Sequence, residues 1–343
     1  MNTSLSPRTV GIFLGVAYGI LIRVSWELDE LKNVGDLVTI SFMFLLPMVI
    51  GYIRVHFELK VIPELTKRKA IVIAWQPIFV FLLASVVTLL EGSICVVIAL
   101  PAFMFFASIG GVIAIYLNRI FRKRKQQTLL SVAFLPILLA PVELNFLHLS
   151  KTYEVSNSIV IAAPASVVWS QLANVEPIKA DEWSCSLTQL IGVPKPIAAN
   201  MVVGDGDMVG AVRTSTWQKG VEFNEIITRW QPNKALLYRF DIDPNRIPDH
   251  ALDKHVKLGG EYFSPLFGGY EIEEDGNGHT ILHLKTTLLD NTNFGFYSRI
   301  WGELIFQDFH QSLLHLMKQR AERISHPART NPEQSLAEQF CLS

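Results

Sequence analysis

The feature that most constrains this chain is an apolar stretch from Ala70 to Asn118, in which Glu91 is the single charged residue. A helix needs about 20 mostly apolar residues to cross the hydrocarbon of a bilayer, so this stretch is too long for one helix and suits two. The sequence EGS at Glu91–Ser93 is the expected turn between them. The chain is therefore predicted to contain a membrane region.

The rest of the first half extends this region. Five spans are predicted, over 9–26, 37–54, 70–90, 94–118 and 128–147. Hydrophobic residues make up 50% of the chain and charged residues 18%, a balance too apolar for an ordinary soluble protein. No small-residue cleavage site follows the first run, so a retained helix is expected rather than a signal peptide.

The basic residues predict how these spans are oriented. Lysine and arginine collect in 54–69 and 119–125, whereas the loop between the first two spans is acidic. Basic loops stay in the cytoplasm, which places the N-terminus there too. An odd number of spans then puts the residues after 148 on the other side, in the periplasm of a bacterium with two membranes. The prediction is a multi-pass protein of the bacterial inner membrane.

Three ionisable residues, Arg23, Glu91 and Glu143, fall near the outer ends of predicted spans. Ionisable side chains at membrane depth are candidates for a functional role. Two structural alternatives stay open: the side chains lie among lipid headgroups, or Arg23 pairs with Glu91 or Glu143 and holds helices together.

The second half, from about 151, has the pattern of an α+β domain. Alternation and turn residues predict strands over 153–162, 207–217, 221–230, 234–243, 261–274 and 279–290, and helices over 164–174 and 296–325. The gap at 218–220 and the DGNG sequence at 275–278 indicate hairpins. The looser segment between 175 and 206 is expected to hold a short helix and a crossing segment, and 327–343 a tail.

The closing helix is predicted to bury a broad apolar face. Successive residues placed 100° apart form one arc, with His310 at its edge and Asp308 and His315 outside it. The arc consists of Trp301, Ile305, Phe306, Phe309, Leu313, Leu316 and Met317. A curved antiparallel sheet wrapped around such a helix leaves a cavity unless large side chains fill it.

This half resembles the START-like, helix-grip (SRPBCC) superfamily of polyketide cyclases, lipid-transfer domains and plant hormone receptors. The resemblance is carried by IVIAAPASVVW, FNEIITRWQPNKALLYRF and GGYEIEEDGNGHTILHLKT. Most of the chain is similar to bacterial proteins described as polyketide cyclase/dehydrase or lipid-transport related, in which such a domain follows membrane helices. They share an EG-x-IC…P feature at 91–101 and a W-x-x-x-I…H…L…K-x-R-A-E pattern at 301–322. The resemblance implies a helix-grip fold and an apolar ligand.

Three residues are candidates for chemistry: Glu225, His283 and His310. Glu225 either points into the cavity, where burial raises the pKa of its carboxyl, or forms a cross-strand pair with Arg213, Arg229 or Arg239. The two histidines beside Glu225 would form an acid–base or metal set, but each also suits a structural role. No H-x-x-x-H or H-E-x-x-H spacing is present, so no metal is predicted.

A hydrophobic molecule or lipid is the predicted partner. The residues expected to line its site are Trp217, Phe223, Glu225, Tyr238, Tyr270, His283, Trp301, Ile305 and Phe309. No cofactor motif is found, and the sequence names no protein partner. Residues 151–343 carry 17 basic against 23 acidic residues, which argues against nucleic acid. Cys185 and Cys341 are a possible disulfide, whereas Cys95 is expected to be a buried thiol in a span.

The favoured function is a membrane-anchored binding protein for a hydrophobic small molecule or lipid, acting in transfer, sensing or presentation. One alternative is a cyclase- or hydrolase-type enzyme that uses Glu225 with His283 or His310. The other is a docking scaffold with a vestigial cavity. The expected organisation is a membrane region over 1–150, a helix-grip domain over 151–326 and a tail over 327–343.

Overall fold

The computed structural model describes residues 6–26, 28, 39–121, 125–146, 150–183, 186–202, 208–248, 250–252, 256–260, 262–276 and 278–326. The chain forms two compact units. One comprises residues up to Leu149 together with Thr292–Phe294, and the other comprises Ser150–Asn291 and the chain from Gly295 onward. Cys185, Cys341 and the predicted tail lie outside the described residues.

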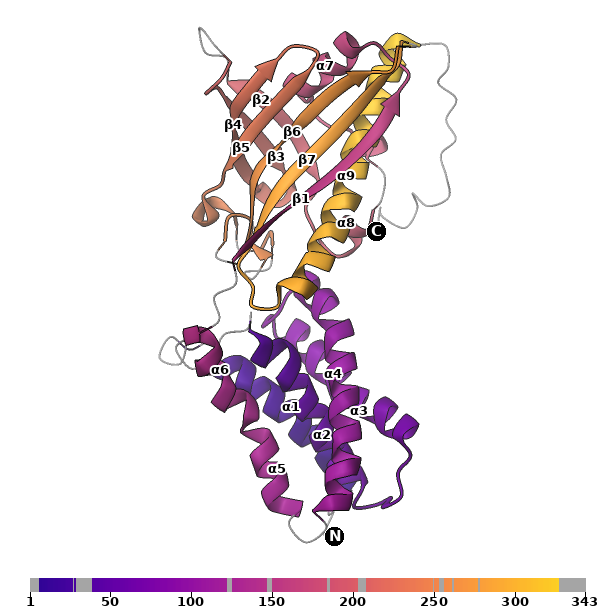
Figure 1. The fold of residues 1–343 in the computed structure, drawn as a ribbon, viewed down its shortest axis with the longest axis vertical. Helices are drawn as coiled ribbons and strands as arrows, with labels where there is room; N and C mark the ends of the chain where they lie inside the picture. Colours follow the sequence, from indigo (N-terminus) through magenta and orange to yellow (C-terminus); the bar gives the residue numbers. More distant parts are fainter. Residues whose placement is uncertain are drawn as a thin grey trace. The chain divides into compact units, whose positions relative to one another are not determined.

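The first unit is helical (Figure 1). Its elements are α1 (Pro7–Ser25), η2 (Ser41–Leu45), α2 (Leu46–Glu58), α3 (Lys67–Val87), α4 (Ser93–Ile120), α5 (Lys125–Ala133) and α6 (Leu135–Phe146). Among the described residues, four helices are long and apolar enough to cross a membrane: Pro7–Ser25, Ser41–Glu58, Lys67–Val87 and Ser93–Ile120. The predicted span over 128–147 corresponds to the end of α5 and to α6, two short helices separated at Phe134.

Small residues let the helices of this unit approach one another closely. α2 lies at the centre, with contacts to α1, α3 and α4. A Cβ atom on Gly51 would overlap with the Ala107 carbonyl, and one on Gly110 would overlap with the Met48 carbonyl. Backbone contact at small residues is how helices associate where lipid removes the hydrophobic driving force.

The three polar membrane candidates make specific contacts within this unit. Arg23 is fully buried, and its Nε donates to Glu91 Oε1 at 2.5 Å. Glu143 instead accepts hydrogen bonds from the backbone N–H groups of Ile40 and Ser41, at 2.5 and 3.0 Å. A carboxylate at the first residues of a helical segment satisfies N–H groups that have no partner inside the helix. Of the two pairs considered from the sequence, the structure therefore contains Arg23–Glu91.

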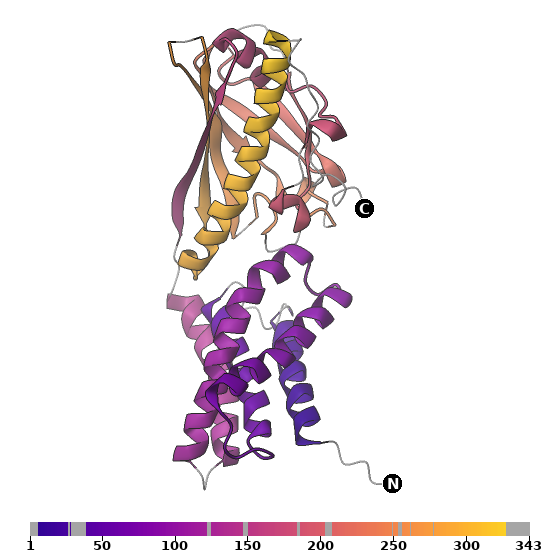
Figure 2. The same cartoon turned by 90° about the vertical axis from the view of Figure 1, so that its right-hand side faces the viewer.

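The second unit is a curved sheet with a long helix across one face (Figure 2). Its strands are β1 (Lys151–Ile161), β2 (Pro196–Val202), β3 (Val212–Trp217), β4 (Glu222–Gln231), β5 (Ala235–Asp241), β6 (Phe263–Glu274) and β7 (Thr280–Asp290). All pairings are antiparallel, in the order β1-β7-β6-β5-β4-β3-β2. The helices are α7 (Ala165–Ala173), α8 (Leu187–Leu190) and α9 (Gly295–Ser325), with short 3-10 turns η3 (Ala180–Glu182), η4 (Gln218–Gly220) and η5 (Pro244–Arg246). This is the predicted helix-grip arrangement of a sheet around a terminal helix.

The sheet differs from the prediction at β2 and in β4. β2 lies in the segment expected to be a crossing, because its Ala198–Ala199 pair lacks the branched and aromatic residues that favour strands. In β4 the register shifts between Ile227 and Arg229. A bulge of this kind turns the following side chains to the other face, so Arg229 does not share the inward face of Glu225.

The inward face of α9 is more polar than the predicted arc. Its buried side chains include His310, Leu314, Met317 and Arg320, whereas Trp301, Ile305, Phe306, Phe309 and Leu313 are half-buried. Arg320 forms a bidentate pair with Glu182, with Nε–Oε1 and Nη2–Oε2 distances of 3.1 and 2.7 Å. Polar residues of the 301–322 pattern thus attach the helix to the rest of the domain.

Candidate functional site

Strand alternation points one set of side chains at α9 and forms a cup. The inward residues change in character along each strand. β4 presents Ile227, then Glu225, then Phe223, and β5 presents Leu236, Tyr238 and Phe240 in the same direction. Along each strand these residues form an apolar, a polar and an aromatic level, although across the strands the register places Ile227 opposite Tyr238 and Glu225 opposite Phe240.

The apolar level is closely packed. Ile161, Val168, Leu172, Leu282 and Met317 are all at 0% exposure and belong to one cluster. They come from β1, α7, β7 and the C-terminal half of α9. This end of the cup is therefore filled by the protein's own side chains.

The aromatic level is only partly closed. The rings of Trp217 and Phe309 stack with centroids 5.0 Å apart, and Phe223 lies 5.8 Å from both Trp217 and Phe240. Phe223 is buried, but Trp217, Phe240 and Phe309 remain half-buried although they face the helix–sheet interior. Inward aromatic rings that keep accessible surface provide an apolar wall for a guest molecule.

The polar level is built around one buried ion pair. Arg213 and Glu225 are directly opposite each other on β3 and β4, and both are at most 4% exposed. Arg213 Nε donates to Glu225 Oε2 at 2.5 Å, and Nη1 donates to the Leu172 carbonyl at 2.6 Å. Its guanidinium also lies over the Tyr238 ring, 4.9 Å from the centroid. Two alternatives were considered for Glu225 from the sequence, and its side chain combines them: it points inward, and it pairs across the strands with Arg213.

Electrostatics at this level follow from burial. Burial raises the pKa of the Glu225 carboxyl, and the Arg213 guanidinium opposes that shift. Because a guanidinium keeps its proton in proteins, the direct contact favours the ionised carboxyl at neutral pH. Burial also raises the pKa of Tyr238 well above its usual range and that of Tyr270 to about 12. Both phenols therefore stay protonated and can donate hydrogen bonds.

Among the described residues, the buried side-chain atoms without a hydrogen-bond partner are Tyr153 Oη, Trp183 Nε1, His283 Nε2 and Ser325 Oγ, and the Tyr270 hydroxyl is not one of them. The Tyr270 side chain is 3% exposed and comes from β6, beside Leu236 and Leu284. The Arg213 and Glu225 charges act on it without hydrogen bonding to it.

The two histidines do not join Glu225. His310, on α9, is fully buried between two polar side chains: Nε2 lies 2.9 Å from Thr286 Oγ1, and Nδ1 lies 3.0 Å from Asn157 Oδ1. Burial lowers the pKa of His310 from 6.5 to about 4, so the imidazole is neutral at physiological pH. It connects α9 to β1 and β7, which is a structural role.

His283 lies on the outer face of β7. Its strand alternates buried even-numbered and half-buried odd-numbered residues, and Leu282 and Leu284 belong to the core. His283 Nε2 lies 3.7 Å from the exposed Glu273 carboxylate. The acid–base set of Glu225, His283 and His310 is therefore not assembled, and His283 does not line the cup. Among the described residues, no cluster with metal-ligand geometry is found.

The other predicted lining residues are distributed unevenly. Trp217, Phe223, Tyr238 and Phe309 belong to the polar and aromatic levels. Tyr270 lies beside Leu236 and Leu284 in the packed cluster, and Trp301 and Ile305 lie half-buried on the first half of α9. Phe240 was missed from the sequence, although it shares the alternating face of Leu236 and Tyr238. Arg213 was named as an ion-pair partner but not as a member of the site.

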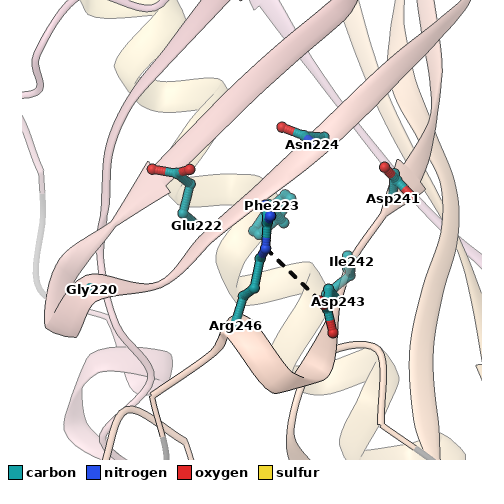
Figure 3. A pocket seen from close by; sticks show the side chains of 8 residues that line it. All are labelled: Gly220, Glu222, Phe223, Asn224, Asp241, Ile242, Asp243 and Arg246. Carbon is teal, nitrogen blue, oxygen red and sulfur yellow. Dashed lines mark ion pairs between the residues drawn. The ribbon is translucent and has the colours of Figure 1, made fainter.

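A depression lies on β4 and β5, and its lining includes Phe223 of the aromatic level (Figure 3). It measures about 480 Å³, and Figure 3 shows Glu222, Asn224 and Asp241 on the side of β4 and β5 away from α9. Arg246 lies 3.9 Å from Asp243 at its rim. Its lining joins charged and polar side chains to the apolar Phe223 and Ile242.

No protein-family model matches the sequence, and no curated protein matches it. Among solved structures, norcoclaurine synthase from Thalictrum flavum, in complex with a transition-state analogue, is 14% identical with a TM-score of 0.32, over 52% of this chain and 99% of that one. The Zhui aromatase/cyclase from Streptomyces sp. R1128 is 13% identical with a TM-score of 0.32, over 52% and 100%. Ara h 8.0201 is 12% identical with a TM-score of 0.32, over 51% and 99%. The fold described above rests on this chain's own strands and helices.

Proposed function

We propose that this chain is a membrane-anchored binding protein for a hydrophobic small molecule or lipid, held in the cup of the second unit. The observation that carries the proposal is the half-buried aromatic level of Trp217, Phe240 and Phe309 above a closed apolar end. A packed core would close off these rings as completely as it closes off Leu172 and Met317. Rings that face inward and remain accessible suit an apolar guest.

Membrane anchoring is supported by the composition and lengths of the helices in the first unit. Four helices have the length and apolarity of a span, and α5 with α6 returns along the bundle from the end of α4 (Figure 1). Both basic segments, after α2 and after α4, then belong to one end of the bundle. We expect that end in the cytoplasm of a bacterial inner membrane and the cup in the periplasm. Anchoring would keep the cup where apolar molecules partition, for transfer, sensing or presentation to a partner.

The catalytic alternative finds less support. General acid–base chemistry needs its groups within hydrogen-bond reach of one substrate atom. Here Glu225 is paired with Arg213, His310 is held by Thr286 and Asn157, and His283 lies on the opposite face of the sheet. Binding without catalysis accounts for these positions more simply.

The test is extraction of the full chain, purified from membranes in detergent, followed by native mass spectrometry. We expect an apolar compound bound at about one molecule per chain and absent from an equal quantity of empty detergent micelles. A matched variant, Phe240→Asp, places a charge in the aromatic level and should lose the compound. Purified wild-type chain with no bound compound, or equal retention by the variant, contradicts the proposal.

The orientation is tested separately by fusing alkaline phosphatase after residue 326, because this enzyme is active only in the periplasm. An active fusion is expected. Activity of a cytoplasmic reporter at the same site would instead show that the number of spans is even.

A further inference from the structure

We propose that the basic end of the helical unit binds anionic phospholipid, so that the partner of this surface is the negatively charged head-group layer of a bilayer. The inference rests on the membrane anchoring in the proposed function and adds the class of lipid that this end of the bundle prefers. The surface, here called the basic collar, consists of five exposed cations: Lys60 after α2, Lys67, Arg68 and Lys69 at the start of α3, and Arg119 at the end of α4.

The first step is that three helices meet at the basic collar. A Cβ atom on Gly111 of α4 would lie 3.1 Å from both the Ala70 carbonyl of α3 and the Val55 side chain of α2. The Lys67 ammonium lies 5.1 Å from the centre of the Tyr116 ring on α4. Cations that are far apart in the sequence therefore share one surface.

The second step is that this positive charge is not compensated by the protein. Among the described residues, none of the five cations forms an ion pair with a carboxylate. The buried Glu58 carboxylate at the end of α2 is occupied by Arg8 and Arg54, at 3.1 and 2.9 Å.

The start of α3 adds to this charge. Its Thr66 side chain does not cap the helix, and its first turn has no acidic residue. Three cations at the positive end of a helix dipole repel that end and one another, so an anion from outside would stabilise them.

The third step is the apolar surface beside the basic collar, which favours lipid over other polyanions. On α3, Val72, Phe79, Leu83 and Val87 are exposed. From Lys69 to Val87 the helix rises about 27 Å, close to the thickness of the hydrocarbon layer of a bilayer. Cations at one end of such a surface lie at the depth of the lipid phosphates, whereas an RNA or an acidic protein would leave the apolar side chains in water.

The experiment titrates the full-length chain, in neutral detergent, with phosphatidylglycerol or phosphatidylcholine that carry the same acyl chains. Bound lipid per chain is read by native mass spectrometry, with the thermal unfolding midpoint alongside. The variant is the triple substitution Lys67→Gln, Arg68→Gln and Lys69→Gln. The matched control removes the same charge from three exposed cations of the second unit: Lys179→Gln, Lys234→Gln and Arg239→Gln.

We expect the wild-type chain to bind phosphatidylglycerol more tightly than phosphatidylcholine. A cation near an anionic surface strengthens binding about fivefold, so the triple variant should bind phosphatidylglycerol at least about tenfold more weakly. The control should match wild type. Raising the salt concentration from about 0.1 to 0.5 M should weaken only the binding of phosphatidylglycerol, a result that needs no variant.

Equal binding of the two lipids by wild type, or equal weakening in the variant and the control, would overturn the inference. Competition by inorganic phosphate or an RNA oligonucleotide as strong as that by phosphatidylglycerol would also overturn it, because the surface would then be a general anion site. In either case a chain that remains in the membrane fraction leaves the anchoring in the proposed function standing. A chain that is soluble without detergent would refute both.

Discussion

At the residue scale, the interior of the cup depends on an ion pair that has no access to water. Removing one partner of such a pair leaves the other charged and buried, which typically costs about 3–5 kcal/mol. We expect Glu225→Gln to destabilise the domain by an amount of this order, measured by denaturant unfolding in detergent.

Two controls accompany that prediction. The double variant Arg213→Met with Glu225→Leu removes both charges and should recover most of the loss. Arg299→Met breaks the exposed pair with Glu303 on α9 and should cost about 0.5 kcal/mol or less. A Glu225→Gln variant as stable as wild type would show that the pair is solvated.

His310 gives the domain a predictable response to acid. Its pKa is about 4 in the folded state, because of burial, against 6.5 when exposed. The unfolded state therefore binds the proton first, so the stabilisation is complete above pH 6.5 and is lost as the pH falls from 6.5 to 4. The full effect is up to about 3 kcal/mol.

The measurement is unfolding free energy against pH for wild type and His310→Asn. The variant, which has no titrating ring, should show a shallower slope between pH 6.5 and 4. Parallel slopes would mean that other groups cause the acid response.

At the element scale, close helix contacts in the first unit limit side-chain size. A Cβ on Gly110 would overlap with the backbone of Met48, which cannot move aside as a flexible side chain can. We expect Gly110→Ala to separate α2 from α4 and lower the thermal unfolding midpoint in detergent. At Gly111, where the nearest atoms would lie 3.1 Å away, the same substitution should be much milder. Equal effects at the two positions would contradict the described packing.

Strands and hairpins were predictable where the local pattern of apolar and turn residues determines them. Alternation located β4, β5 and β7, and the short gap at Gln218–Gly220 sets a hairpin in which Arg213 and Glu225 are opposite each other. It was less predictable which side chains of α9 are buried against the sheet, because a pattern of apolar residues does not reveal buried polar ones. His310 lies inward because Thr286 and Asn157 satisfy it, and Asn157 is 153 residues away in the chain. Such partners depend on tertiary register, which no local pattern contains.

At the scale of the whole molecule, the two halves of the chain differ in composition and charge. Residues 1–150 hold 13 basic and 8 acidic residues, and the later residues carry the acidic excess. The contiguous apolar runs made the four long helices predictable. The break between α5 and α6 was not, since Pro136 and Pro141 are tolerated in membrane helices and alone do not fix where a helix ends.

Photolabelling can show whether an apolar guest occupies the cup. Full-length chain in detergent is equilibrated with a hexadecanone that carries a diazirine in mid-chain, then irradiated, and the modified residues are mapped by peptide mass spectrometry. If the cup holds the guest, we expect saturable labelling on β3–β5 and on α9 near Phe309, blocked by excess 2-hexadecanone. Labelling confined to α1–α4, or labelling of the cup that excess ketone does not reduce, would contradict it.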